Sequence, residues 1–327
     1  MISIDDVRQA AQRLGNHRDL TPILEVQAVN ALVGGRVLFK AENLQRTGSF
    51  KFRGAFNKIA SLTPAQREKG VVTFSSGNHA QGVAAAAAHF GVPATVVMPA
   101  DAPAIKRENT ARLGADLVLY DRASGDRKAI AAEISATTGA VLVPPYDDAA
   151  IMAGQGTIGL EIVEQTQAMG VKPDVLLCPI GGGGLMAGIS VALRALLPET
   201  QIYCVEPEGF DDTRVSLERG ERTANQPGAS SICDAIVTDM PGELTFELVR
   251  RNLDGGLAVS DHEVLRAVET LFQEAKLVVE PGGAVGLAAL LAGKLSLEGR
   301  TAVVILSGGN MDLDAFRQRF GLGEAED

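Results

Sequence analysis

The hydrophobic residues of this chain fall into short runs rich in Val, Ile and Leu, separated by longer stretches with apolar residues at helical spacing. The short runs predict strands, and helical stretches separate most of them. Parallel strands need such crossovers, so the pattern predicts an α/β fold of open, mostly parallel sheets flanked by helices. In the first half, strands are predicted at 36–40, 70–75, 94–98, 116–120 and 140–143, and helices at 5–14, 54–61, 81–90, 104–113 and 126–137.

A second series of elements follows and predicts a second domain. We expect a large domain made of residues 1–45 together with 151–320, a smaller domain at 46–150, and an acidic tail at 321–327. Gly255-Gly256 is interpreted as a connecting loop. The second series has strands at 175–180, 201–206 and 301–306, and helices at 156–169, 185–197, 261–274 and 284–292.

Composition narrows the class of protein. The 327 residues are 46% hydrophobic, which suffices for two domains with substantial cores. A net charge of −10 repels phosphate backbones, so a small-molecule substrate is favoured over nucleic acid. No stretch offers the roughly 20 apolar residues of a membrane span, and no basic and apolar leader opens the chain, so a soluble cytoplasmic protein is predicted. The three cysteines are widely spaced in apolar surroundings and are expected to be buried reduced thiols.

Lys51 is the first candidate for chemistry, because it lies between two aromatic residues in a predicted loop bounded by glycines, 48-GSFKFRGA-55. Loss of hydration beside apolar rings disfavours the ammonium and lowers the pKa of the lysine. A neutral lysine amine can form a Schiff base with a carbonyl compound. The alternative is an exposed lysine between two phenylalanines of the core.

Two further segments lie where a predicted strand meets a predicted helix. Gly181 to Gly184 would let backbone amides and a helix N-terminus converge on a phosphate. No Gly-Lys-Ser/Thr follows, so a nucleotide P-loop does not fit, and the glycine spacing differs from a dinucleotide fingerprint. The segment 75-SSGNHAQG-82 offers hydroxyl groups and backbone donors that can hold a carboxylate.

These segments, with 307-SGGN-310 near the C-terminus, resemble in order the motifs of the pyridoxal-phosphate enzymes that include threonine and serine dehydratases and serine racemase. The resemblance runs from about Asp19 to Leu313. It implies pyridoxal 5'-phosphate in the cleft between the two domains, a homodimer, and a small β-hydroxy amino acid as substrate. The chain ends about where a catalytic module of this family would end, without a following regulatory domain.

The resemblance also implies a role for individual residues. Lys51 would carry the cofactor, Asn78 would hydrogen-bond its ring hydroxyl, and Ser307 would face its pyridine nitrogen. Ser76 would be a base on the ring face opposite the lysine. For His79, helix capping is an equal alternative to substrate contact. The implied cofactor-binding residues are Phe50, Lys51, Asn78, Gly181, Gly182, Gly183, Gly184, Leu185, Glu280 and Ser307, and the implied substrate residues are Ser75, Ser76, Gly77, His79 and Arg127.

A metal site is implied by the turn 206-EPEGFDD-212, which places several oxygen donors after a predicted strand. In serine racemase-like members the positions matching Glu206, Asp212 and the Phe210 carbonyl bind Mg²⁺ or Ca²⁺. The alternative is a solvated acidic turn.

The function implied is pyridoxal-phosphate-dependent β-elimination of L-threonine or L-serine to a 2-oxo acid and ammonia. The alternative within the family is serine racemase or threo-3-hydroxyaspartate ammonia-lyase, which Ser76 and Arg127 favour, because an arginine can pair with a second substrate carboxylate. A solvated helix arginine is the simpler interpretation of Arg127. A non-catalytic amino-acid-binding or phosphate-binding protein is the alternative of a different class.

Overall fold

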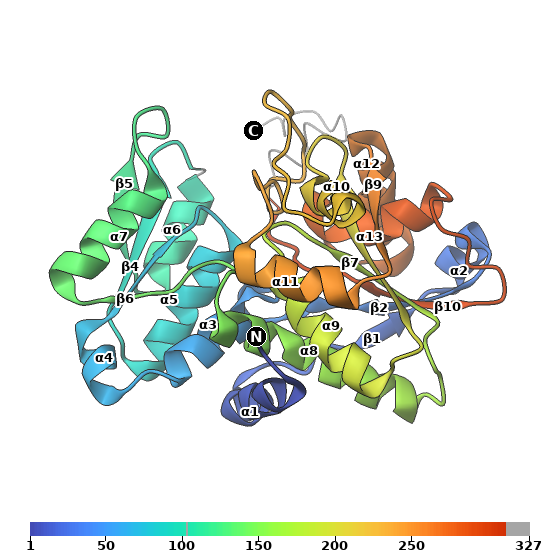
Figure 1. Cartoon of the computed structure of the whole chain (residues 1–327), viewed down its shortest axis with the longest axis horizontal. Helices are drawn as coiled ribbons and strands as arrows, with labels where there is room; N and C mark the ends of the chain where they lie inside the picture. Colours follow the sequence, from blue (N-terminus) through green and yellow to red (C-terminus); the bar gives the residue numbers. More distant parts are fainter. Residues whose placement is uncertain (103, 312–327) are drawn as a thin grey trace, which may run out of the picture.

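The computed structural model describes residues 1–102 and 104–311, which form two lobes, each built on one sheet (Figure 1). The acidic tail predicted at 321–327 lies outside this range. The predicted α/β architecture with two mostly parallel sheets is confirmed. The proposed domain bounds agree with the residues that each sheet uses, but as bounds they stay a prediction.

The larger sheet has six strands in the order β1-β2-β10-β7-β8-β9. Only β1 runs antiparallel to its neighbour, and the other neighbours are parallel. The N-terminal strands join strands from the C-terminal half, so this lobe is discontinuous in sequence. The strands are β1 Ile23–Glu25, β2 Arg36–Lys40, β7 Val175–Pro179, β8 Gln201–Pro207, β9 Gly255–Val259 and β10 Thr301–Ile305.

Helices cover both faces of the larger sheet and enclose a separate apolar cluster on each face. One cluster contains side chains of α2, α12 and α13, and the other contains side chains of α1, α8, α9 and α11. The helices are α1 Ile4–Leu14, α2 Gln27–Val33, α8 Ala149–Ala168, α9 Gly184–Leu196, α10 Asp212–Arg219, α11 Glu243–Asn252, α12 Asp261–Thr270, continued by a π-helical turn Leu271–Ala275, and α13 Pro281–Leu291.

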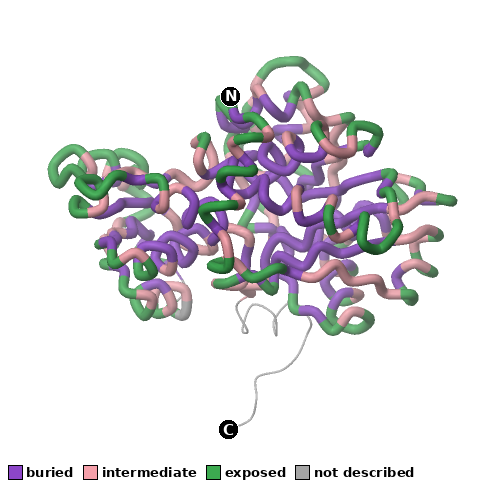
Figure 2. Tube along the Cα trace, turned by 90° about the horizontal axis from the view of Figure 1, so that it is seen from below, coloured by how far each residue is buried: buried purple, intermediate pink, exposed green. Residues whose placement is uncertain are grey.

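The smaller sheet has four parallel strands in the order β5-β4-β3-β6. Helices α3 and α5 pack on one face and α7 on the other. Figure 2 shows buried chain running through the middle of both lobes and exposed chain at the loops. The elements are α3 Lys51–Ala60, α4 Pro64–Lys69, β3 Val71–Phe74, α5 Asn78–Phe90, β4 Ala94–Pro99, α6 Ala104–Arg112, β5 Asp116–Tyr120, α7 Arg127–Thr138 and β6 Val141–Leu142.

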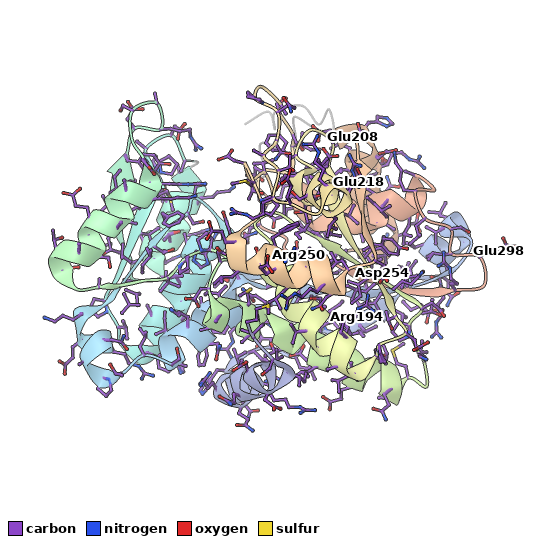
Figure 3. The ribbon with its side chains drawn as sticks, in the orientation of Figure 1. Arg194, Glu208, Glu218, Arg250, Asp254 and Glu298 are labelled. Atoms are coloured by element: carbon purple, nitrogen blue, oxygen red, sulfur yellow. The ribbon has the colours of Figure 1, made fainter. Side chains whose placement is uncertain are left out.

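The loop predicted at Gly255-Gly256 is wrong, because these residues begin the edge strand β9. A side chain at Gly256 would lie 2.9 Å from Arg214 Cβ and 3.0 Å from Cys204 Sγ, so the glycine lets α10 and β8 approach closely. Asp254 holds the start of the strand by accepting hydrogen bonds from Ile202 N and from Arg194, which lies beside it in Figure 3.

Three helices begin earlier than their composition predicts. Lys51 is the first residue of α3 and not part of a loop, α5 begins at Asn78, and α8 begins at Ala149. In α8 the Asp148 carboxylate accepts the N–H groups of the first turn. Gly154, in the first part of α8, lets two helices pack closely, since a Cβ there would lie 2.7 Å from the Gly54 Cα of α3. Helices α2, α4, α10 and α11 were not predicted at all.

Within the described part of the chain, no helix combines the length and the apolar character needed to cross a lipid bilayer.

Candidate active site

A cleft of about 620 Å³ lies between the two lobes and is lined by segments of both. It brings together the start of α3, the segment before α5, the turn before α9 and the chain after β10. All the cofactor and substrate residues expected from the sequence line it, although their individual roles stay predictions. They are Phe50, Lys51, Ser75, Ser76, Gly77, Asn78, His79, Arg127, Gly181, Gly182, Gly183, Gly184, Leu185, Glu280 and Ser307.

The Lys51 amine is enclosed by the cleft and donates a hydrogen bond to the Pro145 carbonyl oxygen at 2.8 Å. Burial lowers the pKa of Lys51 to about 8, and the nearby Glu280 carboxylate opposes that shift in part. The amine lies 5.1 Å from the centre of the Phe50 ring. The second ring expected beside it is elsewhere, because Phe52 packs against Phe56 in the core of the smaller lobe. The Lys51 amine therefore loses its proton near pH 8, well below the usual range of a lysine.

The chain before Lys51 is held by the chain after β10. Ser49 and Gly308 form an isolated antiparallel bridge, and the Phe50 N–H donates to the Ser307 carbonyl oxygen at 3.2 Å. The Gly309 N–H donates to the Gly48 carbonyl oxygen at 2.9 Å. Two motifs that lie some 250 residues apart in the sequence therefore form one wall of the cleft.

Asn78 is fixed by two side chains. Its Nδ2 donates to Glu280 Oε1 at 2.5 Å, and its Oδ1 accepts from Asn310 Nδ2 at 2.8 Å. Burial, with the nearby Asp234 as a smaller cause, raises the pKa of Glu280 to about 7, although the hydrogen bond from Asn78 opposes the shift. Because an amide nitrogen carries two protons, Asn78 keeps one N–H for a ligand. Asn310 belongs to a motif recognised in the sequence, but its link to Asn78 is visible only in the structure.

The glycine turn presents backbone donors to the cleft. Gly183 has a φ of +93° and α9 begins at Gly184. Among the described residues, no acceptor is found for the N–H groups of Gly181 to Gly184. A Cβ on Gly182 would lie 2.2 Å from the Tyr146 ring, so only glycine fits there. Unpaired N–H groups at a helix N-terminus suit an anion, and a phosphate group fits this turn.

His79 does not cap its helix, because the N-cap residue of α5 is Gly77 and His79 bonds elsewhere. Its Nε2 lies 3.0 Å from the Val143 carbonyl oxygen, which can only accept, so Nε2 carries the proton. Burial lowers the pKa of His79 to about 3, with the Lys51 charge as a further cause. The imidazole is therefore neutral, and its Nδ1 is buried without a hydrogen bond within the described structure.

Ser75 and Arg127, expected to bind substrate, also line the cleft. Ser75 Oγ accepts the Gly77 N–H at 3.2 Å, which shapes the turn before α5. Arg127 is exposed at the start of α7, with its guanidinium 5.9 Å from the centre of the Phe74 ring. No carboxylate of the described residues forms an ion pair with Arg127, so its charge is free to meet a ligand.

The expected metal residues lie away from the cleft, at the end of β8. Glu206 accepts the N–H groups of Thr213 at 2.9 Å and Arg214 at 2.8 Å, while Asp212 Oδ1 accepts from Asn225 Nδ2 at 2.7 Å. Asp212 Oδ2 is buried without a hydrogen-bond partner in the described part. Burial raises the pKa of Asp212 to about 7 and that of Glu206 well above its usual range. No group of three His, Cys, Asp or Glu side chains is placed to hold a metal there or elsewhere in the described ranges.

Comparison with known proteins gives a consistent result. Residues 15–308 match the family described as pyridoxal-phosphate dependent enzyme. The chain is 43% identical to an L-threonine ammonia-lyase of Thermotoga maritima, over 96% of this chain and 77% of that protein. It is 42% identical to an L-threo-3-hydroxyaspartate ammonia-lyase of Saccharomyces cerevisiae, over 95% and 94%. The structure of maize serine racemase, 36% identical, superposes with a TM-score of 0.91 over 98% of this chain and 97% of that one.

Proposed function

The chain belongs to the pyridoxal-phosphate-dependent enzyme family, and from that premise we propose a role for each residue of its cleft. It is an ammonia-lyase of the threonine dehydratase type, which converts L-threonine or L-serine to a 2-oxo acid and ammonia by β-elimination. One observation supports the proposal above all others: an amine whose pKa is lowered to about 8 shares a cleft with a turn whose backbone N–H groups have no acceptor among the described residues.

We propose that pyridoxal 5'-phosphate is held from three sides. The N–H groups of the glycine turn and Leu185 would bind its phosphate, Asn78 would bind its ring hydroxyl, and Ser307 would bind its pyridine nitrogen. Phe50 and Glu280 would flank the ring. When bound, the cofactor supplies an aldehyde for the lysine amine and a ring that withdraws electrons from the substrate Cα. A hydroxyl opposite the pyridine nitrogen does not keep that nitrogen charged, which favours elimination over reactions that need a long-lived carbanion.

Lys51 is the base of the reaction in this proposal. Its neutral amine removes the proton from the substrate Cα, the β-hydroxyl group takes up one proton and leaves as water, and hydrolysis of the product enamine gives the 2-oxo acid and ammonia. Ser75, Gly77 and His79 hold the substrate carboxylate, largely through backbone groups. For His79 the donor would be the backbone N–H, because the single proton of its neutral ring is donated to the Val143 carbonyl oxygen and Nδ1 can only accept.

Serine racemase or threo-3-hydroxyaspartate ammonia-lyase activity is the second candidate. Its support is the Arg127 guanidinium, which lines the cleft, has no ion-pair partner among the described residues and fits a second substrate carboxylate, together with the Ser76 hydroxyl in the cleft wall. In this reading Ser76 exchanges a proton on the face opposite Lys51.

A substrate panel separates the two readings. We expect L-threonine and L-serine to exceed the 3-hydroxyaspartate isomers in kcat/KM, with 2-oxo acid and product chirality measured in parallel. Arg127→Ala should then change little, and Ser76→Ala should retain most L-serine elimination. The second reading replaces the first if the dicarboxylate is preferred and that preference falls about ten- to a hundredfold in Arg127→Ala, the value of a charge-assisted pair. Formation of D-serine from L-serine would likewise support the racemase reading.

The domain proposal keeps the bounds given above, with residues 46–150 closing over the substrate as the mobile domain. The ion pair from Lys106 on α6 to Asp234 on the other lobe, at 3.1 Å, spans the cleft mouth and would tighten or open with that motion. Small-angle scattering with and without a substrate analogue tests the closure, and an unchanged radius of gyration would contradict it.

We also propose a Mg²⁺ or Ca²⁺ ion at Glu206, Asp212 and the Phe210 carbonyl. Two buried carboxylates with raised pKa values, one of them with an unpaired oxygen, would be stabilised in their charged form by a cation. Chelation should lower thermal stability and activity together, and Glu206→Gln should have the same effect. Glu208→Gln is the matched control, since Glu208 is exposed two residues further on (Figure 3). If removal of metal leaves the melting temperature unchanged, residues 206–212 form an acidic turn without a bound cation.

A cytoplasmic homodimer completes the proposal. Leu20, Leu44 and Val278 are 62%, 50% and 53% exposed, and hydrogen bonds from Gln45 to Asp19 and from Asn43 to Val278 connect their segments. An apolar patch of this kind suits a second copy of the chain. Sedimentation should give twice the chain mass, and Leu44→Glu should weaken the association. Buried thiols at Cys178 and Cys204 suit a reducing compartment, which cell fractionation can test.

A further inference from the structure

Thr245 lies directly behind the glycine turn, on the side away from the cleft. It is fully buried in the first turn of α11 and does not line the cleft. Helix α11 lies near the boundary between the lobes (Figure 1). Thr245 Oγ1 donates a hydrogen bond to the Gly182 carbonyl oxygen at 2.8 Å. A Cβ on Gly183 would lie 2.8 Å from Thr245 Oγ1, so the two segments are in close contact.

This hydrogen bond determines the direction of a backbone donor. The peptide between Gly182 and Gly183 is trans and planar, so its C=O and N–H point in opposite directions. With the carbonyl held toward Thr245, the Gly183 N–H points away from Thr245, toward the cleft that the glycines line. Glycines flank both sides of this peptide and offer no steric barrier to its rotation. The Thr245 hydroxyl therefore determines which way the Gly182–Gly183 peptide points, because no side chain on either glycine does so.

Thr245 is itself held in place by the segment after β6. Gly242, the N-cap residue of α11, has no side chain to cap the helix, and Asp147 does so instead. Asp147 Oδ2 accepts the Glu243 N–H at 3.0 Å and Oδ1 accepts the Thr245 N–H at 3.0 Å. The same segment carries Pro145, whose carbonyl binds the Lys51 amine. Thr245 is thus in contact with the glycine turn and with the segment whose Pro145 carbonyl binds the Lys51 amine.

We propose that Thr245 is a positioning residue, which orients the Gly182–Gly183 peptide so that its N–H group can bind the cofactor phosphate. This inference rests on the proposed role of the glycine turn. Without the hydroxyl, the Gly182 carbonyl is left buried without its donor, and rotation of the peptide toward the cleft would present an oxygen to the phosphate. The loss should therefore affect ligands with a phosphate and spare ligands without one.

The experiment compares the dissociation constants of pyridoxal phosphate and pyridoxal for cofactor-free protein. In Thr245→Val we expect pyridoxal phosphate to bind about ten- to a hundredfold more weakly, the value of a hydrogen bond to a charged group, with pyridoxal within about twofold of wild type. Inorganic phosphate competes with the cofactor for the glycine turn, and its inhibition constant should rise correspondingly in Thr245→Val. Thr245→Ser keeps the hydroxyl and should bind both ligands as wild type does.

Thr166→Val is the matched control, because Thr166 is equally buried and donates to the Ile162 carbonyl within α8. It should leave the affinity ratio of the two ligands unchanged. Equal weakening of both ligands in Thr245→Val, or no weakening, would overturn the inference. A lower ratio of pyridoxal phosphate affinity to pyridoxal affinity in Thr245→Ser would also overturn it. If Thr245→Val does not fold, the result for Thr245→Ser decides the matter. If wild-type protein binds both ligands equally, the phosphate role of the glycine turn fails instead.

Discussion

Arg53, two residues after Lys51, should be the most sensitive ion-pair residue to replace. It is fully buried and donates to both oxygens of Glu42, at 2.8 and 2.8 Å, and to both oxygens of Glu161, at 2.6 and 2.8 Å. Through these contacts α3 is fixed to the chain after β2 and to α8. Replacement with methionine leaves Glu42 buried without an ion-pair partner among the described residues.

The expected magnitude follows from that burial. Removing one partner of a buried ion pair costs about 3–5 kcal/mol of unfolding free energy. Arg8 provides the control, since its pair with Asp5 is exposed at both side chains, 54% and 75%. Arg8→Met should change the unfolding free energy by less than about 1 kcal/mol. Urea unfolding of the two variants and wild type, followed by circular dichroism, measures the difference.

The pH dependence gives a second test of the same reasoning. Burial by itself would raise the pKa of Glu161, but Arg53 and Lys40 outweigh burial and lower it from 4.5 to about 2. A carboxyl group with a lowered pKa stabilises the fold above pH 4.5 and loses that effect as the pH falls toward 2. The stability gap between wild type and Arg53→Met should therefore be full at pH 7 and narrow below 4.5. A variant as stable as Arg8→Met, or a gap that does not change with pH, would refute this account.

Three other substitutions test the cleft. Lys51→Ala should abolish 2-oxo acid formation with the fold intact, and turnover within about tenfold of wild type would contradict the role of the lysine. Cofactor uptake by cofactor-free protein, followed by stopped-flow absorbance, should rise as the pH passes about 8, where Lys51 loses its proton. Glu280→Gln should lower the midpoint pH of this rise, because the Glu280 charge raises the pKa of Lys51. A higher midpoint pH in Glu280→Gln would exclude this account. Gly182→Ala should weaken cofactor binding more than about tenfold in fluorescence titration, with partial recovery in the double variant Gly182→Ala/Tyr146→Ala, because its Cβ would lie 2.2 Å from the Tyr146 ring.

Local patterns predicted most of the secondary structure but failed at glycine-rich segments. The double glycine of β9 and the Gly154 to Gly156 stretch of α8 have the composition of loops, yet they lie in a strand and a helix. A glycine can mark a flexible turn or a close contact, and the sequence around it does not distinguish the two. Which one applies depends on the neighbour, such as Gly54 beside Gly154 or Arg214 beside Gly256.

The sequence by itself predicted the fold class, the family motifs and a part of the residues that line the cleft, because alternation, spacing and residue type are properties of the chain. Only the tertiary structure decided how those residues are held. The pairing of Ser49 with Gly308, the hydrogen bond from Asn78 to Glu280 and the position of Thr245 behind the glycine turn all join segments distant in sequence. The pKa of Lys51 likewise depends on enclosure by walls from both lobes, and the expected second aromatic ring at Phe52 turned instead into the core. Burial and hydrogen-bond partners, which set these pKa values, depend on contacts between segments that are distant in the sequence. Local sequence patterns therefore do not predict them.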